Sequence, residues 1–235
     1  MHRRPKVSKR DEAGRTGRSR GPLGRGEWEP RQGPGDGQPA RHLPIEVASL
    51  EGRAPVEFPE EGTDYRLNAI AKAQAVCEQR GEWAIADDSG LEVEALNGAP
   101  GPLSARFGGP GLDDSGRVMH LLEEVEKTGG ATRGARFVCH AALGIPGGPI
   151  QTAVGFCEGT LLKSPVGQGG FGYDPIFVPA GYDQAMAELP AGVKDQISHR
   201  ARALNGLIPV IEAWLRDRSN GLEGQQSSSQ GGRER

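Results

Sequence analysis

The chain has 235 residues, a formal net charge of −3 and 35% apolar residues. Its length suits one large or two small domains, and its charge argues against a protein whose whole surface binds nucleic acid. No run of about 18 apolar residues predicts a membrane span, and no apolar segment after the basic N-terminus predicts a secretory signal. Three cysteines without CxxC spacing favour reduced thiols in the cytoplasm over disulfides or a zinc site.

The two ends of the chain differ from its middle. Residues 1–41 carry 11 basic and five acidic residues and few large apolar ones. Such a segment cannot bury enough apolar surface to offset its ordering entropy, so we expect a disordered basic extension over 1–43. A basic arm that touches nucleic acid is the alternative interpretation. The polar residues 219–235 are expected to form a disordered tail, which leaves 44–218 as the folded domain.

Helix and strand patterns alternate through this middle region. Apolar spacing predicts a helix over Asp64–Arg80, which Gly81 ends. Trp83–Ala86 reads as a short buried strand, and Leu91–Leu96 alternates like a half-exposed strand. A second helix is predicted over Leu112–Thr128.

The C-terminal half continues with strands and ends in helix. Strands are predicted over Arg136–Ile145 and Gln151–Leu162, separated by a Pro-Gly-Gly-Pro turn, and over Ile176–Val178. One or two helices are predicted over Val193–Arg218. The order of elements predicts an α/β or α+β fold with a mixed sheet and flanking helices.

An acidic pair is the first candidate for chemistry. Asp87 and Asp88 follow a short apolar strand directly, where open α/β sheets bind their ligands. Neighbouring side chains of an extended backbone point to opposite faces, so the two aspartates are expected to have different roles. One could face magnesium, which takes a few carboxylates together with phosphate oxygens. An ordinary Asp-Asp-Ser-Gly turn is the alternative.

A glycine-rich loop is the second candidate. Gly169, Gly170 and Gly172 surround Phe171, and Asp174 follows. Glycines let a backbone approach a ligand closely, and the single ring suits stacking on a planar base. A glycine turn with a core phenylalanine is the simpler alternative.

Cationic side chains could bind phosphate. Lys72 lies one helical turn after Asn68, and Lys194 and Arg200 flank His199. His199 could act as a base or read a purine edge, although a structural histidine is the commoner case. Arg106 is a further candidate, balanced against an ordinary surface arginine.

Five motifs follow one another in order: EEGxxYxxNAxxKA, ADDSGL, GAPGxxSARF, GGFGYDPxF and AELxxxxKxxISHRxxAL. Together they resemble the family of pyrophosphatases for non-canonical purine nucleoside triphosphates, also called inosine triphosphatases or XTP/dITP diphosphatases. The resemblance covers about residues 57–216. It implies magnesium-dependent hydrolysis of ITP, dITP and XTP to the monophosphate and pyrophosphate. It also implies an elongated mixed α/β fold with two lobes around a nucleotide cleft, and a cytoplasmic homodimer without a membrane or stable nucleic-acid partner.

The resemblance also assigns site residues. It implies that Asp88 is the catalytic acid or base and a magnesium ligand, with Glu60 as the second metal ligand and Glu61 as the alternative to it. Phe171 corresponds to the ring that stacks on the base. The implied substrate contacts are Lys72, Ser89, Phe171, Gly172, Tyr173, Asp174, Lys194, His199 and Arg200.

One family feature has no counterpart in the sequence. The family opens with a strand and a T-G-N-x-x-K loop that holds the triphosphate, and nothing in residues 1–56 matches it. The first strand and the phosphate loop are therefore expected to be missing or replaced. One hypothesis is that the N-terminus of the sequence is misread. The alternative function is a nucleotide-binding relative with impaired turnover.

Overall fold

The computed structural model describes residues 43, 45, 47–129 and 132–228. The predicted basic extension lies outside these residues except for Leu43, which is buried in a core cluster with Leu207 and Ile211. The packed region therefore includes Leu43, the last residue assigned to the extension.

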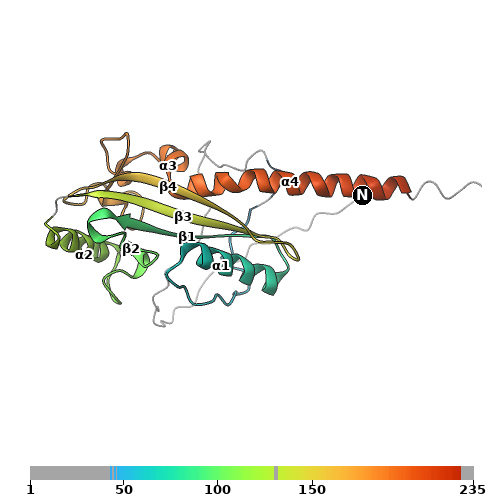
Figure 1. Cartoon of the computed structure of the whole chain (residues 1–235), viewed down its shortest axis with the longest axis horizontal. Coiled ribbons are helices and arrows are strands. Elements are labelled where there is room, and N and C mark those ends of the chain that lie inside the picture. Colours follow the sequence, from blue (N-terminus) through green and yellow to red (C-terminus); the bar gives the residue numbers. More distant parts are fainter. Residues whose placement is uncertain (1–42, 44, 46, 130–131, 229–235) are drawn as a thin grey trace, which may run out of the picture.

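One five-stranded sheet, in the order β2-β1-β3-β4-β5, forms the body of the molecule (Figure 1). The strands are β1 (Ala84–Val93), β2 (Pro100–Gly101), β3 (Gly134–Gly144), β4 (Gln151–Leu161) and β5 (Phe177–Pro179). The helices are α1 (Tyr65–Arg80), α2 (Asp114–Lys127), α3 (Ala191–Ile197) and α4 (His199–Ser228). Short 3-10 turns are η1 (Glu94–Leu96), η2 (Ser104–Arg106), η3 (Asp174–Ile176) and η4 (Met186–Glu188). The α/β class and the flanking helices are as predicted.

All strand pairs among the described residues are antiparallel, where a mixture of directions was expected. A tight turn after Ile145 joins β3 and β4 as a hairpin, which requires opposite directions. β1 pairs with β3 along its whole length but with β2 only at Leu91 and Glu92. Among the described residues, the other edge of β1 from Ala84 to Gly90 therefore has no partner strand.

The predicted helix boundaries agree with the capping groups in the structure. Asp64 caps α1 by accepting from the Leu67 amide at 2.9 Å, and Gly81 ends it in a left-handed conformation with φ of 64°. Asp113 caps α2 in the same way, by accepting from the Gly116 amide. None of the described helices has the length and apolar character that a membrane span requires.

The two strands predicted on either side of the acidic run are one strand, β1, and Glu94–Leu96 is a 3-10 turn. The prediction failed here because Asp-Asp-Ser-Gly has the composition of a turn. In the fold, β3 pairs with one edge of this backbone, and neighbouring side chains pair with its carboxylates. Gly90 fits because a Cβ there would collide with the Gly101 carbonyl and the Tyr65 hydroxyl.

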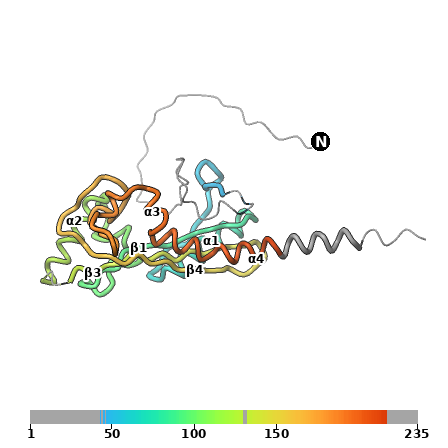
Figure 2. The backbone as a smooth tube through the Cα atoms, turned by 90° about the horizontal axis from the view of Figure 1, so that it is seen from above, coloured from blue at the N-terminus to red at the C-terminus, as the bar shows by residue number. Residues whose placement is uncertain are grey.

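Helices cover both faces of the sheet. Ala69 and Ala73 of α1 pack on Ala142 of β3, whereas α4 packs on the alternate residues Cys139 and Ala141. A second cluster on the α4 side joins α2 to the other end of the sheet. Two apolar cores on the α4 side thus lie along an elongated body (Figure 2), with the acidic part of β1 near their boundary.

The C-terminal helical region divides at Ser198, which separates α3 from α4. The Ser198 hydroxyl accepts from the Ala201 amide and so caps α4. The helix continues through Ser228, into the segment 219–235 that was expected to be disordered. Once a helix is nucleated, each added residue contributes a further hydrogen bond, so a polar continuation can remain helical.

Candidate active site

Asp87 and Asp88 lie in the middle of β1 rather than beyond its end, and the pleat directs them to opposite faces of the sheet. Asp87 faces α4, where it contacts Arg200, and Asp88 faces α1, where it contacts Asn68 and Lys72. Two neighbouring, chemically identical carboxylates therefore have entirely different partners.

The Asp87 carboxylate is enclosed by donors. Its Oδ2 accepts from the Ser89 hydroxyl at 2.7 Å and from Arg200 Nε and Nη2 at 3.2 and 3.1 Å. The Cys139 thiol also approaches it, at 3.6 Å. Burial alone would raise the pKa of Asp87, but the charge of Arg200 and these hydrogen bonds hold it below its usual value. Asp87 is therefore an anion at neutral pH and anchors the start of α4 to the sheet.

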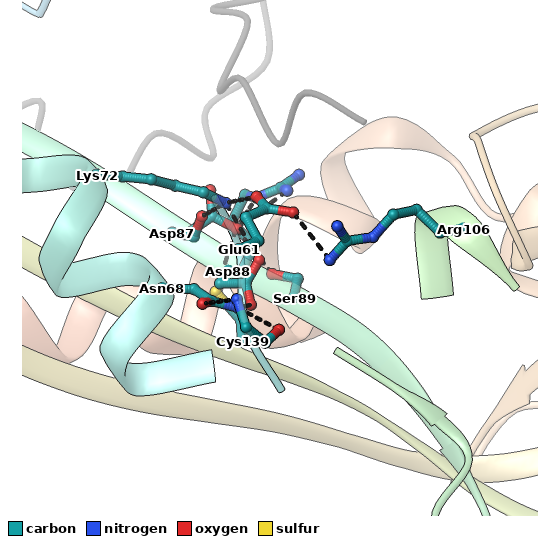
Figure 3. Close-up of polar contacts among 10 residues, drawn as sticks. Glu61, Asn68, Lys72, Asp87, Asp88, Ser89, Arg106 and Cys139 are labelled. Carbon is teal, nitrogen blue, oxygen red and sulfur yellow. Dashed lines mark hydrogen bonds and ion pairs between the residues drawn. The ribbon is translucent and has the colours of Figure 1, made fainter. Parts of the chain in front are cut away.

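The Asp88 carboxylate has fewer hydrogen-bond partners. It accepts from Asn68 Nδ2 at 2.9 Å and from Lys72 Nζ at 3.1 Å (Figure 3). Burial raises the pKa of Asp88 by more than Lys72 and Asn68 lower it. A carboxylate with a raised pKa is a stronger base than an ordinary aspartate.

Glu61 completes this side of the site. Its Oε1 lies 2.5 Å from Lys72 Nζ, and its Oε2 lies 3.5 Å from Arg106 Nη2. Lys72 thus bridges the carboxylates of Glu61 and Asp88, and Figure 3 shows Glu61 between Lys72 and Arg106. Glu60 is exposed, and no hydrogen bond or ion pair links its side chain to another described residue. The structure thus brings Glu61, and not Glu60, next to Asp88.

The glycine-rich loop presents Phe171 on the other side of the site, with its ring 55% exposed. Lys194 Nζ and the Arg200 guanidinium carbon lie 5.9 and 5.8 Å from the ring centroid. Asp174 accepts from the Phe171 amide and pairs with Lys194 at 2.5 Å. Gly170 is required here, because its φ is 81° and a Cβ would collide with Asp174.

His199 lies behind this loop, with an exposed fraction of 6%. Its ring stacks on Phe137 with the centroids 4.8 Å apart. Burial, assisted by Arg200, lowers the pKa of His199 to about 3. The imidazole is therefore neutral near pH 7, with one nitrogen that donates and one that accepts. Its buried Nδ1 has no hydrogen-bond partner among the described residues.

The other predicted substrate contacts bond to groups of the protein itself. Ser89 donates to Asp87, and the Gly172 amide donates to Asp114 at 3.2 Å. Tyr173 is buried, and its hydroxyl donates to the Ser104 carbonyl at 2.9 Å.

Sequence reasoning assigned no site role to Asn68, although it noted that Asn68 shares a helical face with Lys72. That spacing of four residues was the available signal, because both side chains reach Asp88. Asp114 carried no comparable signal, since it meets the loop only through the tertiary fold.

Two groups of residues therefore lie on opposite sides of β1. The Asp88 side offers two carboxylates and two cations, a combination that suits a metal-bound polyphosphate. The Asp87 side offers an exposed ring, two cations and a neutral imidazole, which suits a planar base that carries hydrogen-bonding groups. No group of three or more metal-binding side chains occurs within the described part of the chain.

The chain is similar to proteins of known family. A profile of the Ham1 family matches residues 38–210. The dITP/XTP pyrophosphatase of Nocardia farcinica is 44% identical over 176 residues, covering 74% of this chain and 85% of that protein. The dITP/XTP pyrophosphatase of Streptomyces coelicolor is 46% identical over 156 residues, covering 66% of this chain and 78% of that protein.

Solved structures agree with these matches. A HAM1 protein from Coxiella burnetii has a TM-score of 0.64 at 39% identity, covering 67% of this chain and 82% of that chain. A nucleoside-triphosphatase, or dITP/XTP pyrophosphatase, from Mycobacterium abscessus has a TM-score of 0.55 at 42% identity, covering 66% of this chain and 82% of that chain. The resemblance seen in the five motifs is confirmed: the chain belongs to the Ham1 family.

Proposed function

We propose that this protein hydrolyses non-canonical purine nucleoside triphosphates, namely ITP, dITP and XTP, to the monophosphate and pyrophosphate. The observation that carries the proposal is the meeting of the five motifs around β1, with a polyphosphate-binding set on one side and a base-binding set on the other. The names of the Nocardia and Streptomyces relatives support the same reaction.

The residues on the Asp88 side fit a magnesium ion. The ammonium of Lys72 already lies between Glu61 and Asp88, so the two carboxylates converge on a position that suits a cation. Two carboxylates plus substrate phosphate oxygens form a usual magnesium set. Glu61 and Asp88 would hold the ion, which neutralises charge on the phosphates and acidifies bound water. Lys72 would then be free to contact phosphate.

Asp88 is the proposed general base. Its position beside Lys72 and Glu61, where the ion and its bound water would lie, suits a carboxylate that orients the attacking water and takes its proton. Asn68 donates to Oδ2 and holds the carboxylate in one orientation. Asp87 is not assigned this role, because it faces Arg200 on the other side of the sheet and the charge of Arg200 holds its pKa below the usual value.

Recognition of the base is assigned to the Asp87 side. Phe171 stacks on the purine, and Arg200 and neutral His199 read its edge. Hypoxanthine and xanthine present an acceptor oxygen at position 6, whereas adenine presents a donor amine that would leave a protein donor unpaired. Asp174 and Lys194 hold the loop that carries the ring.

Pyrophosphate release from ITP, XTP, dITP, GTP, ATP and TTP, measured with magnesium, tests the proposal. We expect rapid release from the first three and slow release from ATP and TTP. Release that is equal for ATP and ITP, or absent for all six, would contradict it. Gel filtration would test the expected homodimer in the same preparation.

The absence of a T-G-N-x-x-K run from the sequence supports a second candidate, a relative that binds nucleotides with impaired turnover. Calorimetric titration with ITP and magnesium separates the two, because this relative would bind ITP without releasing pyrophosphate. We expect a version that carries the family's N-terminal loop to hydrolyse ITP faster than this chain. Equal rates would show that the loop is dispensable here.

A further inference from the structure

We propose that Arg106 binds the terminal phosphates of the substrate, the portion that leaves as pyrophosphate. The inference rests on the proposed function and extends it to a residue to which the family resemblance gives no role. Arg106 is the second cation on Glu61, opposite Lys72 (Figure 3).

The turn that carries Arg106 is held rigidly. The Ser104 hydroxyl accepts from the Leu91 amide of β1 at 2.8 Å and donates to the Gly101 carbonyl at 2.7 Å. The Ser104 carbonyl accepts from the buried Tyr173 hydroxyl. The η2 turn is thus fixed both to the strand that carries Asp88 and to the loop that carries Phe171.

The present contact of Arg106 is weak. Its Nη2 lies 3.5 Å from Glu61, near the limit for a hydrogen bond, and its side chain is 47% exposed. Exposed ion pairs of this kind contribute little to stability, so exchanging Glu61 for another anion costs little. A guanidinium binds phosphate with two parallel, charge-assisted hydrogen bonds, which are much stronger.

Charge balance favours the same exchange. The two carboxylates of Glu61 and Asp88 are matched by the two cations of Lys72 and Arg106. When Glu61 and Asp88 serve a metal ion, the charges of Lys72 and Arg106 are left without their carboxylate partners. A metal-bound triphosphate keeps net negative charge, and its terminal phosphates supply the anions that these two side chains then need.

Arg106→Ala tests the assignment, with Arg136→Ala as the matched control. Arg136 is 45% exposed and also pairs with a glutamate, Glu92, at 2.8 Å. Calorimetry with magnesium would measure Kd for inorganic pyrophosphate and for IMP, which lacks the terminal phosphates. We expect Arg106→Ala to weaken pyrophosphate binding about tenfold, or about 1.4 kcal/mol, and to leave IMP binding within about twofold. Arg106→Lys should restore part of the loss, and Arg136→Ala should change neither ligand.

Unchanged pyrophosphate binding in Arg106→Ala would overturn the inference. An equal loss for IMP would also overturn it, because Arg106 would then act by holding the η2 turn and the base loop. The proposed function is judged separately, by pyrophosphate release from ITP with the unaltered protein. The inference can therefore fail while that function stands, and the reverse is also measurable.

Discussion

The two faces of β1 treat adjacent aspartates in opposite ways. On the α4 face, Arg200, Ser89 and Cys139 surround Asp87 and hold its pKa low. On the α1 face, burial raises the pKa of Asp88, and only Asn68 and Lys72 bind its side chain among the described residues. The pleat of a strand, rather than residue type, thus gives two adjacent aspartates different partners and opposite pKa shifts.

Exchanging each aspartate for asparagine is the most direct test of the difference between the two faces. Asp88→Asn should reduce turnover of ITP on the order of 10³-fold, because it removes the proton acceptor and a metal ligand, while the unfolding free energy stays nearly constant. Asp87→Asn should instead lower the unfolding free energy by about 3 kcal/mol, because it leaves Arg200 buried beside a neutral group. Steady-state kinetics and urea unfolding of both variants measure this. Similar profiles for the two would refute the division.

Specificity should depend on the Asp87 face alone. Arg200→Ala should reduce kcat/KM more for ITP than for ATP. The difference in transition-state free energy should be about 1.5–3 kcal/mol, because the 6-oxo acceptor loses a charged donor and the adenine amine does not. Both substrates are measured on one preparation, so any loss of folded protein cancels. Lys194→Ala is the control, since Lys194 also lies near Phe171 but pairs with Asp174. Equal losses for ITP and ATP would assign Arg200 to the phosphates.

Stacking on Phe171 should be indifferent to the identity of the base. Phe171→Ala should raise KM for ITP, XTP and ATP alike. The lost binding free energy should be about 1–3 kcal/mol for each, because every purine has a face to stack. Phe171→Leu keeps apolar volume without an aromatic face and should recover only part of the loss. A loss confined to one purine would show that the ring reads an edge and does not stack.

The smallest expected effect is on the pH dependence of stability. The pKa of Asp87 is lower in the folded state than its usual value of 3.8, so ionised Asp87 stabilises the fold at pH values above 3.8. That stabilisation is lost as the pH falls from 3.8 through the folded-state pKa. Asp88, whose folded pKa is raised, acts oppositely: stability falls as pH rises from 3.8 through the folded pKa. Urea unfolding from pH 3 to 6 gives the unfolding free energy as a function of pH. In Asp87→Asn this free energy should rise less steeply with pH at the acid end of the range. In Asp88→Asn it should fall less steeply, or rise more steeply, above pH 3.8. Slope changes of the same sign would contradict the assigned shifts.

Local sequence signals predicted the elements well where capping groups were present. Asp64 and Gly81 bracket α1, and Asp113 starts α2, so both helices lie close to the predicted ranges. The opposite directions of the Asp87 and Asp88 side chains also followed from alternation along an extended chain. The continuity of β1 could not be predicted, because it depends on Asn68, Lys72 and Arg200 pairing with a polar run from distant positions.

Contacts of site residues that depend on the tertiary fold could not be predicted either. Sequence alone did not decide between Glu60 and Glu61, because the choice depends on which side chain turns towards Lys72. The burial of His199 against Phe137 depends on the approach of α4 to β4 at Gly155, where a Cβ would collide with the His199 carbonyl. Neighbours in sequence indicate neither contact.

Ser104 bonds at once to Leu91 of β1 and, through its carbonyl, to Tyr173 of the glycine-rich loop. In the proposed assignment, this residue sets a fixed distance between the loop that would bind the base and the strand that would bind the phosphates. A nucleotide would have to match that distance to reach both, so the η2 turn would select ligands by length as well as hold an arginine.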